Sequence, residues 1–164
     1  MRKTVDDEIR FADEMGLLCE EAGLPRITGR LLGWLLVCEP AHQSMTDLTA
    51  ALGISKASAS TSTRFLVHIG LVERTILPGD RRDYFRVAGD AWAKFFRRRM
   101  GLVSALKRMA EHGLEVLNGS PAARRGRLEQ MHRLYAFLDE ALPNLIDQFE
   151  AQELRKRRPE RLTP

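Results

Sequence analysis

The chain has 164 residues, of which 44% are hydrophobic, enough for one domain with a packed core. No apolar run approaches the roughly 18 residues of a membrane span. The N-terminus lacks the apolar stretch of a secretion signal. The two cysteines, Cys19 and Cys38, lack the spacing of a disulfide framework. We therefore expect one cytoplasmic domain over residues 1–164 with no membrane partner.

The net charge of +4 is unevenly distributed along the chain. Residues 1–24 hold three basic and seven acidic residues, whereas residues 55–99 hold ten basic and four acidic residues. A basic middle segment suits a polyanionic partner such as nucleic acid. A solvated charged surface has the same composition, so charge alone leaves both interpretations open.

Hydrophobic periodicity and capping residues predict three helices in the first third of the chain. Apolar residues at helical spacing indicate a helix over residues 4–22, and a strongly apolar segment indicates a buried helix over residues 26–38. A short helix is expected in MTDLTAAL, residues 45–52, with Ser44 as its N-cap and Gly53 at its end.

Residues 53–70, GISKASASTSTRFLVHIG, have the composition of a linker but the pattern of a helix that follows a tight turn. Gly53 permits the left-handed turn conformation, and Ser55 is a suitable N-cap. The stripe expected to face inward consists of Ala59, Ser62, Leu66 and Ile69, widened by Phe65. The opposite face carries Lys56, Ala57, Ser60, Thr61, Arg64 and His68. The pattern predicts a helix-turn-helix.

The outward face of this helix has short hydroxyl side chains, and no acid occurs from Ser55 to Val72. Serine and threonine cost up to about 0.5 kcal/mol each in helix propensity relative to alanine, so their repetition favours close approach to something anionic. Short side chains let a helix enter the major groove of DNA, where hydroxyl and basic groups contact phosphates and base edges. The candidate DNA-binding residues here are Ser55, Lys56, Ser58, Ser60, Thr61 and Arg64.

Two short strand candidates follow, joined by the turn sequence PGDRR. Directly after a helix-turn-helix, a basic hairpin predicts a wing from which Arg81 and Arg82 reach the minor groove. Asp80 or Asp83 is expected to pair with one of these arginines and fix its direction. Taken alone, the hairpin would be an ordinary turn with surface charges. The strand candidates are residues 71–77 and 83–88.

The C-terminal part predicts two long helices, from residue 91 to about 117 and from about 121 to 157, and then a basic tail at 158–164 with the composition of a disordered end. The last helix carries a heptad seam over three repeats, which favours self-association over packing on its own domain. Pro143 lies inside this seam and is expected to kink the helix. The candidate dimer-interface residues are Leu128, Met131, Tyr135, Leu138, Leu142, Leu145 and Phe149.

The run from about residue 26 to 90 resembles the winged helix-turn-helix of the MarR family of bacterial transcription regulators, and in particular its GbsR-like branch. The resemblance rests on GLPRITGRLLGWLLV, LTAALGISKASAS, GLVER and PGDRRDYFR. Its most specific point is Asp80-Arg81-Arg82, which matches the family's wing motif.

This resemblance implies a mainly α-helical fold with a small β-hairpin wing. Residues 24–90 would form the DNA-binding core, and residues 1–23 and 91–157 would form flanking dimerisation helices. The family also implies a homodimer on palindromic double-stranded DNA, often a repressor released by a small-molecule effector. Ser62 departs from the family, in which many members have an apolar residue at this position, and this predicts a looser recognition helix.

Other chemistry has less support. No nucleotide-binding or hydrolase motif occurs, so we expect neither an enzyme nor a bound cofactor. Cys38 and His42 are four positions apart, but no further ligand pair joins them, so no metal site is expected. Some MarR proteins sense oxidants through a cysteine in the region of Cys19. Here two glutamates follow Cys19 and would raise the pKa of its thiol, which favours a buried, inert thiol.

Two groups of residues remain open. One is a set of aromatic residues that either line an effector pocket or fill the core, namely Trp34, Trp92, Phe95 and Phe96. The other is the run from Arg97 to Arg99, which either contacts phosphate or forms a solvated face. The predicted function is sequence-specific DNA binding in transcription regulation. The alternative is a winged-helix protein-interaction module or adaptor that does not bind DNA.

Overall fold

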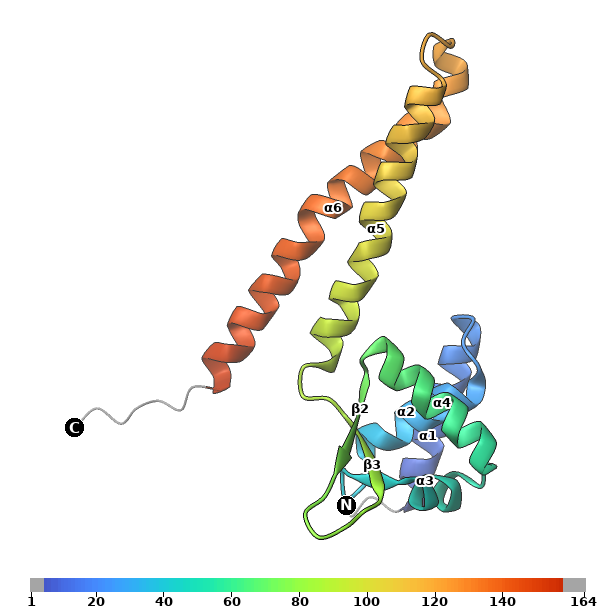
Figure 1. Cartoon of the computed structure of the whole chain (residues 1–164), viewed down its shortest axis with the longest axis vertical. Coiled ribbons are helices and arrows are strands. Elements are labelled where there is room, and N and C mark those ends of the chain that lie inside the picture. The colour runs from blue at the N-terminus through green and yellow to red at the C-terminus, as the bar shows by residue number, and fades with distance from the viewer. Residues whose placement is uncertain (1–4, 158–164) are drawn as a thin grey trace, which may run out of the picture. The chain divides into compact units, whose positions relative to one another are not determined.

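The computed structural model describes residues 5–157 and contains two compact units, the first ending at Trp92 and the second beginning at Ala93. Figure 1 shows the elements of each unit. Those of the first unit are α1 (Val5–Glu21), α2 (Arg26–Val37), β1 (Gln43–Ser44), α3 (Met45–Leu52), α4 (Lys56–Ile69), β2 (Val72–Ile76) and β3 (Asp83–Val87). The prediction of a mainly helical chain with a small β-hairpin is confirmed. The basic tail at 158–164 lies outside the described residues.

Helix α2 packs against both α1 and α4 (Figure 1). Its contact with α1 is close because glycines face that helix. A Cβ atom on Gly29 would lie 2.6 Å from Cys19 Cβ, and one on Gly33 would lie 2.8 Å from Ala12 Cα. Neither position has room for a larger side chain without a shift of the backbone. The pair α1–α2 therefore forms a tightly packed base for the rest of the unit.

The helix-turn-helix forms from α3, the turn and α4 through local hydrogen bonds. Ser44 caps α3 in a capping box, in which its side chain accepts from the Asp47 amide and the Asp47 carboxylate accepts from the Ser44 amide. Gly53 ends α3 in the left-handed conformation with φ 61°. Leu48, Leu52 and Leu66 bury the inner side of the pair.

A three-stranded antiparallel sheet completes the first unit, in the order β1-β3-β2. In the wing, the β2–β3 hairpin with its connecting turn, Thr75 lies opposite Tyr84. The sequence did not predict β1, because two residues are too few for an alternating pattern. Ser44 of β1 pairs with Tyr84 of β3. The residue that caps α3 therefore also belongs to the strand that pairs with the wing along β3.

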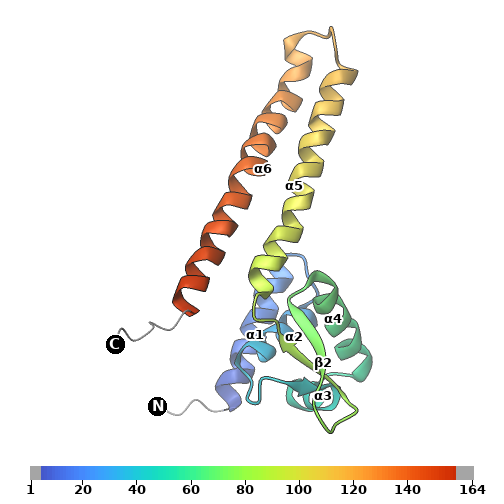
Figure 2. The ribbon, with the colours of Figure 1, turned by 60° about the vertical axis from the view of Figure 1, so that its left-hand side comes forward.

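The second unit contains nearly all of α5 (Ala91–Val116) and all of α6 (Ala122–Arg157), which run antiparallel as a hairpin (Figure 2). Near the tip, a Cβ atom on Gly113 would lie 2.8 Å from Leu128 Cδ1, so this leucine of the heptad seam lies against α5. The helix α6 is continuous through Pro143. Within residues 5–157, no helix combines the length and the apolar character that crossing a bilayer demands.

Candidate nucleic-acid interface

Helix α4 begins with a serine cap and no acidic residue. The Ser55 side chain accepts a hydrogen bond from the Ser58 amide at 3.1 Å, and its hydroxyl donates to Ser58 Oγ at 2.9 Å. The first turn contains no carboxylate, so the partial positive charge of this helix terminus is not compensated locally. Such a terminus attracts phosphate groups.

The candidate residues on α4 lie on its outward side or at the edge of that side. Ser55, Lys56, Thr61 and Arg64 are exposed, and Ser58 and Ser60 are partly exposed. Within the described part of the chain, Lys56 and Arg64 make no ion pair. The outward side therefore presents two uncompensated cations among short hydroxyl side chains.

The inward side of α4 contains Ala59, Ser62 and Leu66, all buried. Ser62 does not leave a polar group unsatisfied, because its Oγ accepts a hydrogen bond from Thr28 Oγ1 of α2 at 3.2 Å. The expectation of a looser helix overlooked this partner, which lies far away in sequence. Thr63, which the periodicity assigned to neither face, is also buried, and its hydroxyl donates to the Ala59 carbonyl at 2.8 Å.

The wing holds one of its two candidate arginines in an internal cluster. Arg82 Nε lies 2.9 Å and Arg82 Nη2 lies 2.6 Å from Asp80 Oδ2, and the Arg82 amide donates to Asp80 Oδ1. The Tyr84 hydroxyl donates to the same carboxylate at 2.8 Å, and the guanidinium lies over the Tyr84 ring, 5.3 Å from its centroid. The bonds from Arg82 hold the pKa of Asp80 well below its usual range, and the bond to Asp80 raises the pKa of Tyr84.

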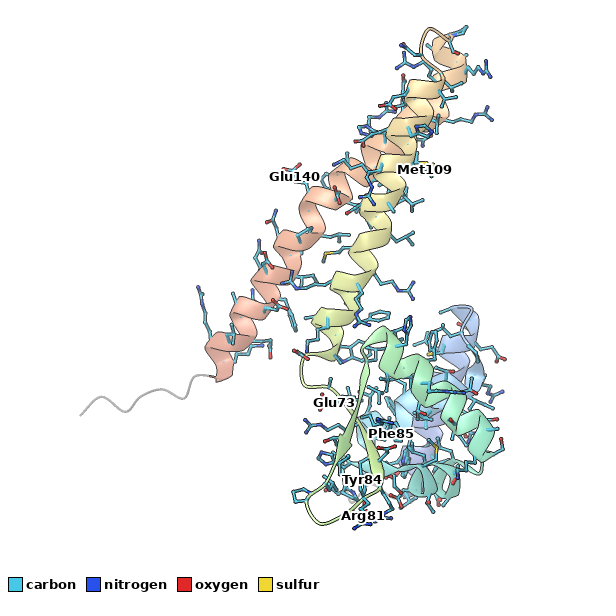
Figure 3. The ribbon with its side chains drawn as sticks, viewed as in Figure 1. Glu73, Arg81, Tyr84, Phe85, Met109 and Glu140 are labelled. Carbon is cyan, nitrogen blue, oxygen red and sulfur yellow. The ribbon has the colours of Figure 1, made fainter. Side chains whose placement is uncertain are left out.

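Arg81 differs from the other arginines of the wing. Arg74 pairs with Asp83 at 3.3 Å, and Arg86 pairs with Glu73. Among the described residues, Arg81 has no carboxylate partner, and its side chain lies near the tip of the wing (Figure 3). The sequence predicted a pairing of Asp80 or Asp83 with one arginine but did not identify which arginine stays unpaired.

Several other candidates lie in surroundings that do not suit a site. Burial raises the pKa of the Cys19 thiol and raises that of Cys38 to about 11, which disfavours a reactive thiolate in both. Trp34 is buried and donates from Nε1 to Gln43 at 3.2 Å, as a residue of the core. No cluster of metal-ligating side chains occurs among residues 5–157.

The arginine run and the remaining aromatic residues belong to α5. Arg97 is held by Asp147 and Glu150 of α6, each at 2.6 Å, and Arg99 lies over the Phe95 ring. Trp92 and Phe96 are exposed. A cavity of about 350 Å³ does occur in the first unit, but its lining residues are Asp7, Glu8, Phe11 and Val37 rather than the candidate aromatics.

The candidate dimer residues of α6 fall into two groups in the second unit. Leu145 and Phe149 are 57% and 49% exposed, whereas the other five are half-buried, Leu128 against α5. Leu134 and Phe137 are also exposed, although the heptad seam did not include them. The apolar surface of α6 is therefore wider than its contact with α5 requires.

Comparisons with known proteins match both units. A MarR family model matches residues 22–83, and a model of MmpR5-like MarR family transcriptional regulators matches residues 90–152. The HTH-type transcriptional regulator MmpR5 of Mycobacterium tuberculosis is 38% identical over 143 residues, covering 87% of each chain. The HTH-type transcriptional repressor OpcR of Bacillus subtilis is 25% identical over 172 aligned positions, covering 94% of this chain and 92% of OpcR.

A crystal structure of a transcriptional regulator is 37% identical and has a TM-score of 0.77, with 88% of this chain and 99% of that chain covered. These matches do not specify the GbsR-like branch. Because MmpR5 is 38% identical over most of both chains, and because each unit matches a model of the same family, the protein belongs to the MarR family of winged-helix transcriptional regulators.

Proposed function

We propose that this regulator acts in the cytoplasm as a homodimer that binds a palindromic operator in double-stranded DNA, rather than as an enzyme. Each α4 would enter a major groove, and the two copies would lie about 34 Å apart along one face of the duplex. Ser55, Lys56, Ser58, Ser60, Thr61 and Arg64 would contact bases and phosphates, and Arg81 and Arg82 would act from the wing.

The observation that carries the proposal is the charge distribution around α4. Its outward side combines Lys56 and Arg64 with short hydroxyl groups and an uncompensated helix N-terminus. A surface helix selected for stability alone would contain stronger helix formers and acidic residues in its first turn. A cationic surface of small side chains fits the edge of a major groove.

The homodimer is supported by the unpartnered apolar surface of α6. Leu134 and Phe137 are 55% and 67% exposed, and Leu145 and Phe149 of the heptad seam lie open beside them. In α1, Leu18 is 60% exposed as well. A second copy of the chain would cover such faces with the symmetry that a palindromic site requires.

Repression and release by a small-molecule effector form the last part of the proposal. The name of the relative OpcR describes that protein as a repressor. For this chain, we expect the dimer to bind an operator in the absence of the effector. The affinity for DNA would fall when the effector favours a different arrangement of the DNA-binding segments of the two protomers.

Genomic footprinting of the tagged protein tests this proposal. We expect a small number of sharp sites that share one palindrome, including one near the gene for this protein. Purified protein should bind a duplex containing that palindrome much more tightly than a scrambled duplex. A protein-interaction module would show no enriched sites, and that result would refute DNA recognition.

A further inference from the structure

A buried pair of hydroxyl groups joins α2 to the inward side of α4. Thr28 Oγ1 donates to Ser62 Oγ at 3.2 Å, and the two residues are only 3% and 5% exposed. The partners are 34 positions apart, so the bond connects two helices rather than two turns of one helix. Because both groups are shielded from water, the bond is not readily exchanged for one to solvent.

On α4, the two buried residues nearest Ser62, Ala59 and Thr63, have short side chains, and the first large one, Leu66, lies one turn further on. Ala59 is fully buried beside Ser62, and the hydroxyl of buried Thr63 is bonded to carbonyls of its own helix. Short side chains allow two helices to approach closely, but they interdigitate less than large ones and define the rotation of a helix only weakly. A directional bond in such a contact can specify one arrangement among several of similar packing energy.

The rotation of α4 matters because its recognition side chains share the turn that contains Ser62. Thr61 and Arg64 lie one and two positions away in sequence. A rotation of about 20° moves side-chain atoms that are about 5–6 Å from the helix axis by about 2 Å. A displacement of that size breaks a hydrogen bond to a base edge.

We propose that Thr28 is a positioning residue for DNA recognition, whose hydrogen bond to Ser62 fixes the orientation of the outward side of α4. This inference rests on the proposed DNA-binding function. A positioning role also explains why the polar residues Thr28 and Ser62 occupy a buried contact that apolar side chains of similar size would fill. Since α2 is packed closely on α1 through Gly29 and Gly33, the bond ties α4 to the α1–α2 base.

Two substitutions of Thr28 separate the hydroxyl from the volume of the side chain. Thr28→Val keeps the shape and removes the donor, whereas Thr28→Ser keeps the donor and removes a methyl group. First, the wild-type protein selects a duplex from a random-sequence library. The readout for each variant is its affinity for that selected duplex divided by its affinity for a scrambled duplex. We expect Thr28→Val to lower this ratio about tenfold, the discrimination that one good base contact supplies, and Thr28→Ser to retain it within about twofold.

Thr63→Val is the matched control, because it removes a buried hydroxyl from α4 whose bonds remain within that helix. It should keep the wild-type ratio, and thermal unfolding of each variant checks that differences in folding do not explain the result. If Thr28→Val does not fold, Ser62→Ala is compared with Thr63→Val in the same way.

Each outcome bears on a separate claim. A wild-type ratio in folded Thr28→Val, or an equal loss in Thr28→Ser or Thr63→Val, would overturn the positioning role while DNA recognition stands. A wild-type protein that selects no sequence from the library would refute the proposed function, and the positioning role with it.

Discussion

The Asp80 carboxylate accepts hydrogen bonds from Nε and Nη2 of Arg82. Arg81, the next residue, has no carboxylate partner in the described chain. The two neighbouring arginines therefore have different roles. Arg82 stabilises the turn that contains Gly79, and Arg81 is the cation available to a polyanion. Because Arg82 is exposed and Asp80 is partly exposed, the ion pair between them acts mainly on the geometry of the wing rather than on global stability.

Alanine substitutions distinguish the two wing arginines. Arg81→Ala should weaken binding to all duplexes about equally, because the proposed contact of this side chain is with the DNA backbone. It should leave the unfolding temperature unchanged, because Arg81 is exposed and has no carboxylate partner among the described residues. Arg82→Ala should weaken binding and also lower the unfolding temperature slightly, because Asp80 and Tyr84 lose their partner. Fluorescence anisotropy and thermal denaturation measure both effects. Full affinity in Arg81→Ala would contradict this assignment.

The cap of α4 allows stability and DNA binding to be separated at Ser55. Ser55→Ala should lower the free energy of unfolding by about 1 kcal/mol, because the Ser58 amide loses its acceptor. Ser55→Asp keeps a capping oxygen and places a carboxylate where phosphate is expected, so it should retain stability and lose DNA affinity. Denaturant unfolding and anisotropy give the two values. Unchanged DNA affinity in Ser55→Asp would argue against phosphate contact at this terminus.

At the scale of elements, the α5–α6 hairpin is held by polar contacts at regular intervals as well as by apolar ones. Arg97, Ser104 and Glu111 follow each other at heptad spacing on α5 and meet acidic or histidine side chains of α6. Lys107 adds an ion pair to Asp139 at 3.1 Å. Such contacts specify the register of two helices whose apolar surfaces would tolerate a shift.

The contact at Asp139 predicts a pH-dependent contribution to stability. The Ser104 hydroxyl and then the Lys107 ammonium lower the pKa of Asp139 below its ordinary value of 3.8. A carboxyl whose pKa is lower in the folded state stabilises the fold above its ordinary pKa and loses this contribution as the pH falls through the folded value. Asp139→Asn should therefore be destabilised relative to the wild type at neutral pH, and this difference should shrink below pH 3.8.

Denaturant unfolding at neutral pH and below pH 3.8 measures the difference in stability between the wild type and Asp139→Asn. Glu140→Gln is the control, because Glu140 is the adjacent, exposed carboxylate of α6 (Figure 3). Among the described residues, the side chains of Ser104 and Lys107 bond to Asp139 and not to Glu140. A difference between wild type and Asp139→Asn that persists unchanged into acid would contradict the account.

The glycines of α2 give a second prediction at this scale. Gly29→Ala should destabilise the protein by about 1–3 kcal/mol, because the new Cβ atom overlaps Cys19. Gly126→Ala in α6 meets no atom within 4 Å and should stabilise its helix by up to about 1 kcal/mol. Opposite signs in denaturant unfolding are expected. A neutral or stabilising effect of Gly29→Ala would show that α1 and α2 pack less closely than described.

Local chemistry explains which parts of this fold could be predicted from the sequence. Gly53 and Ser55 each act within a few residues of themselves, so the turn and the start of α4 were predicted correctly. The bond between Thr28 and Ser62 joins distant positions, and no periodic pattern reports it. Likewise, turn composition predicts the wing but not which arginine Asp80 binds, since this depends on side-chain geometry and on Tyr84.

For the whole molecule, the two compact units correspond to two matched segments of the MarR family, residues 22–83 and 90–152. The first unit contains the candidate DNA-binding surface, and the second contains the exposed apolar residues of α6, among them Leu134, Phe137, Leu145 and Phe149. A regulator built in this way would place its DNA contacts on the first unit and the α6 part of its self-association surface on the second. The assignment of α6 to the dimer interface remains a prediction.

The salt dependence of DNA binding tests the central claim, that α4 and the wing bind the DNA backbone, most directly. Affinity for the selected operator duplex is measured over a range of salt concentrations for the wild type and for Lys56→Ala/Arg81→Ala. The control is Arg10→Ala, which removes one positive charge per protomer from α1. Each phosphate contact contributes about 0.9 to the slope of log affinity against log salt. The double variant of a dimer should therefore lose about 3–4 units of slope, and Arg10→Ala should lose little. An unchanged slope in the double variant would contradict the account.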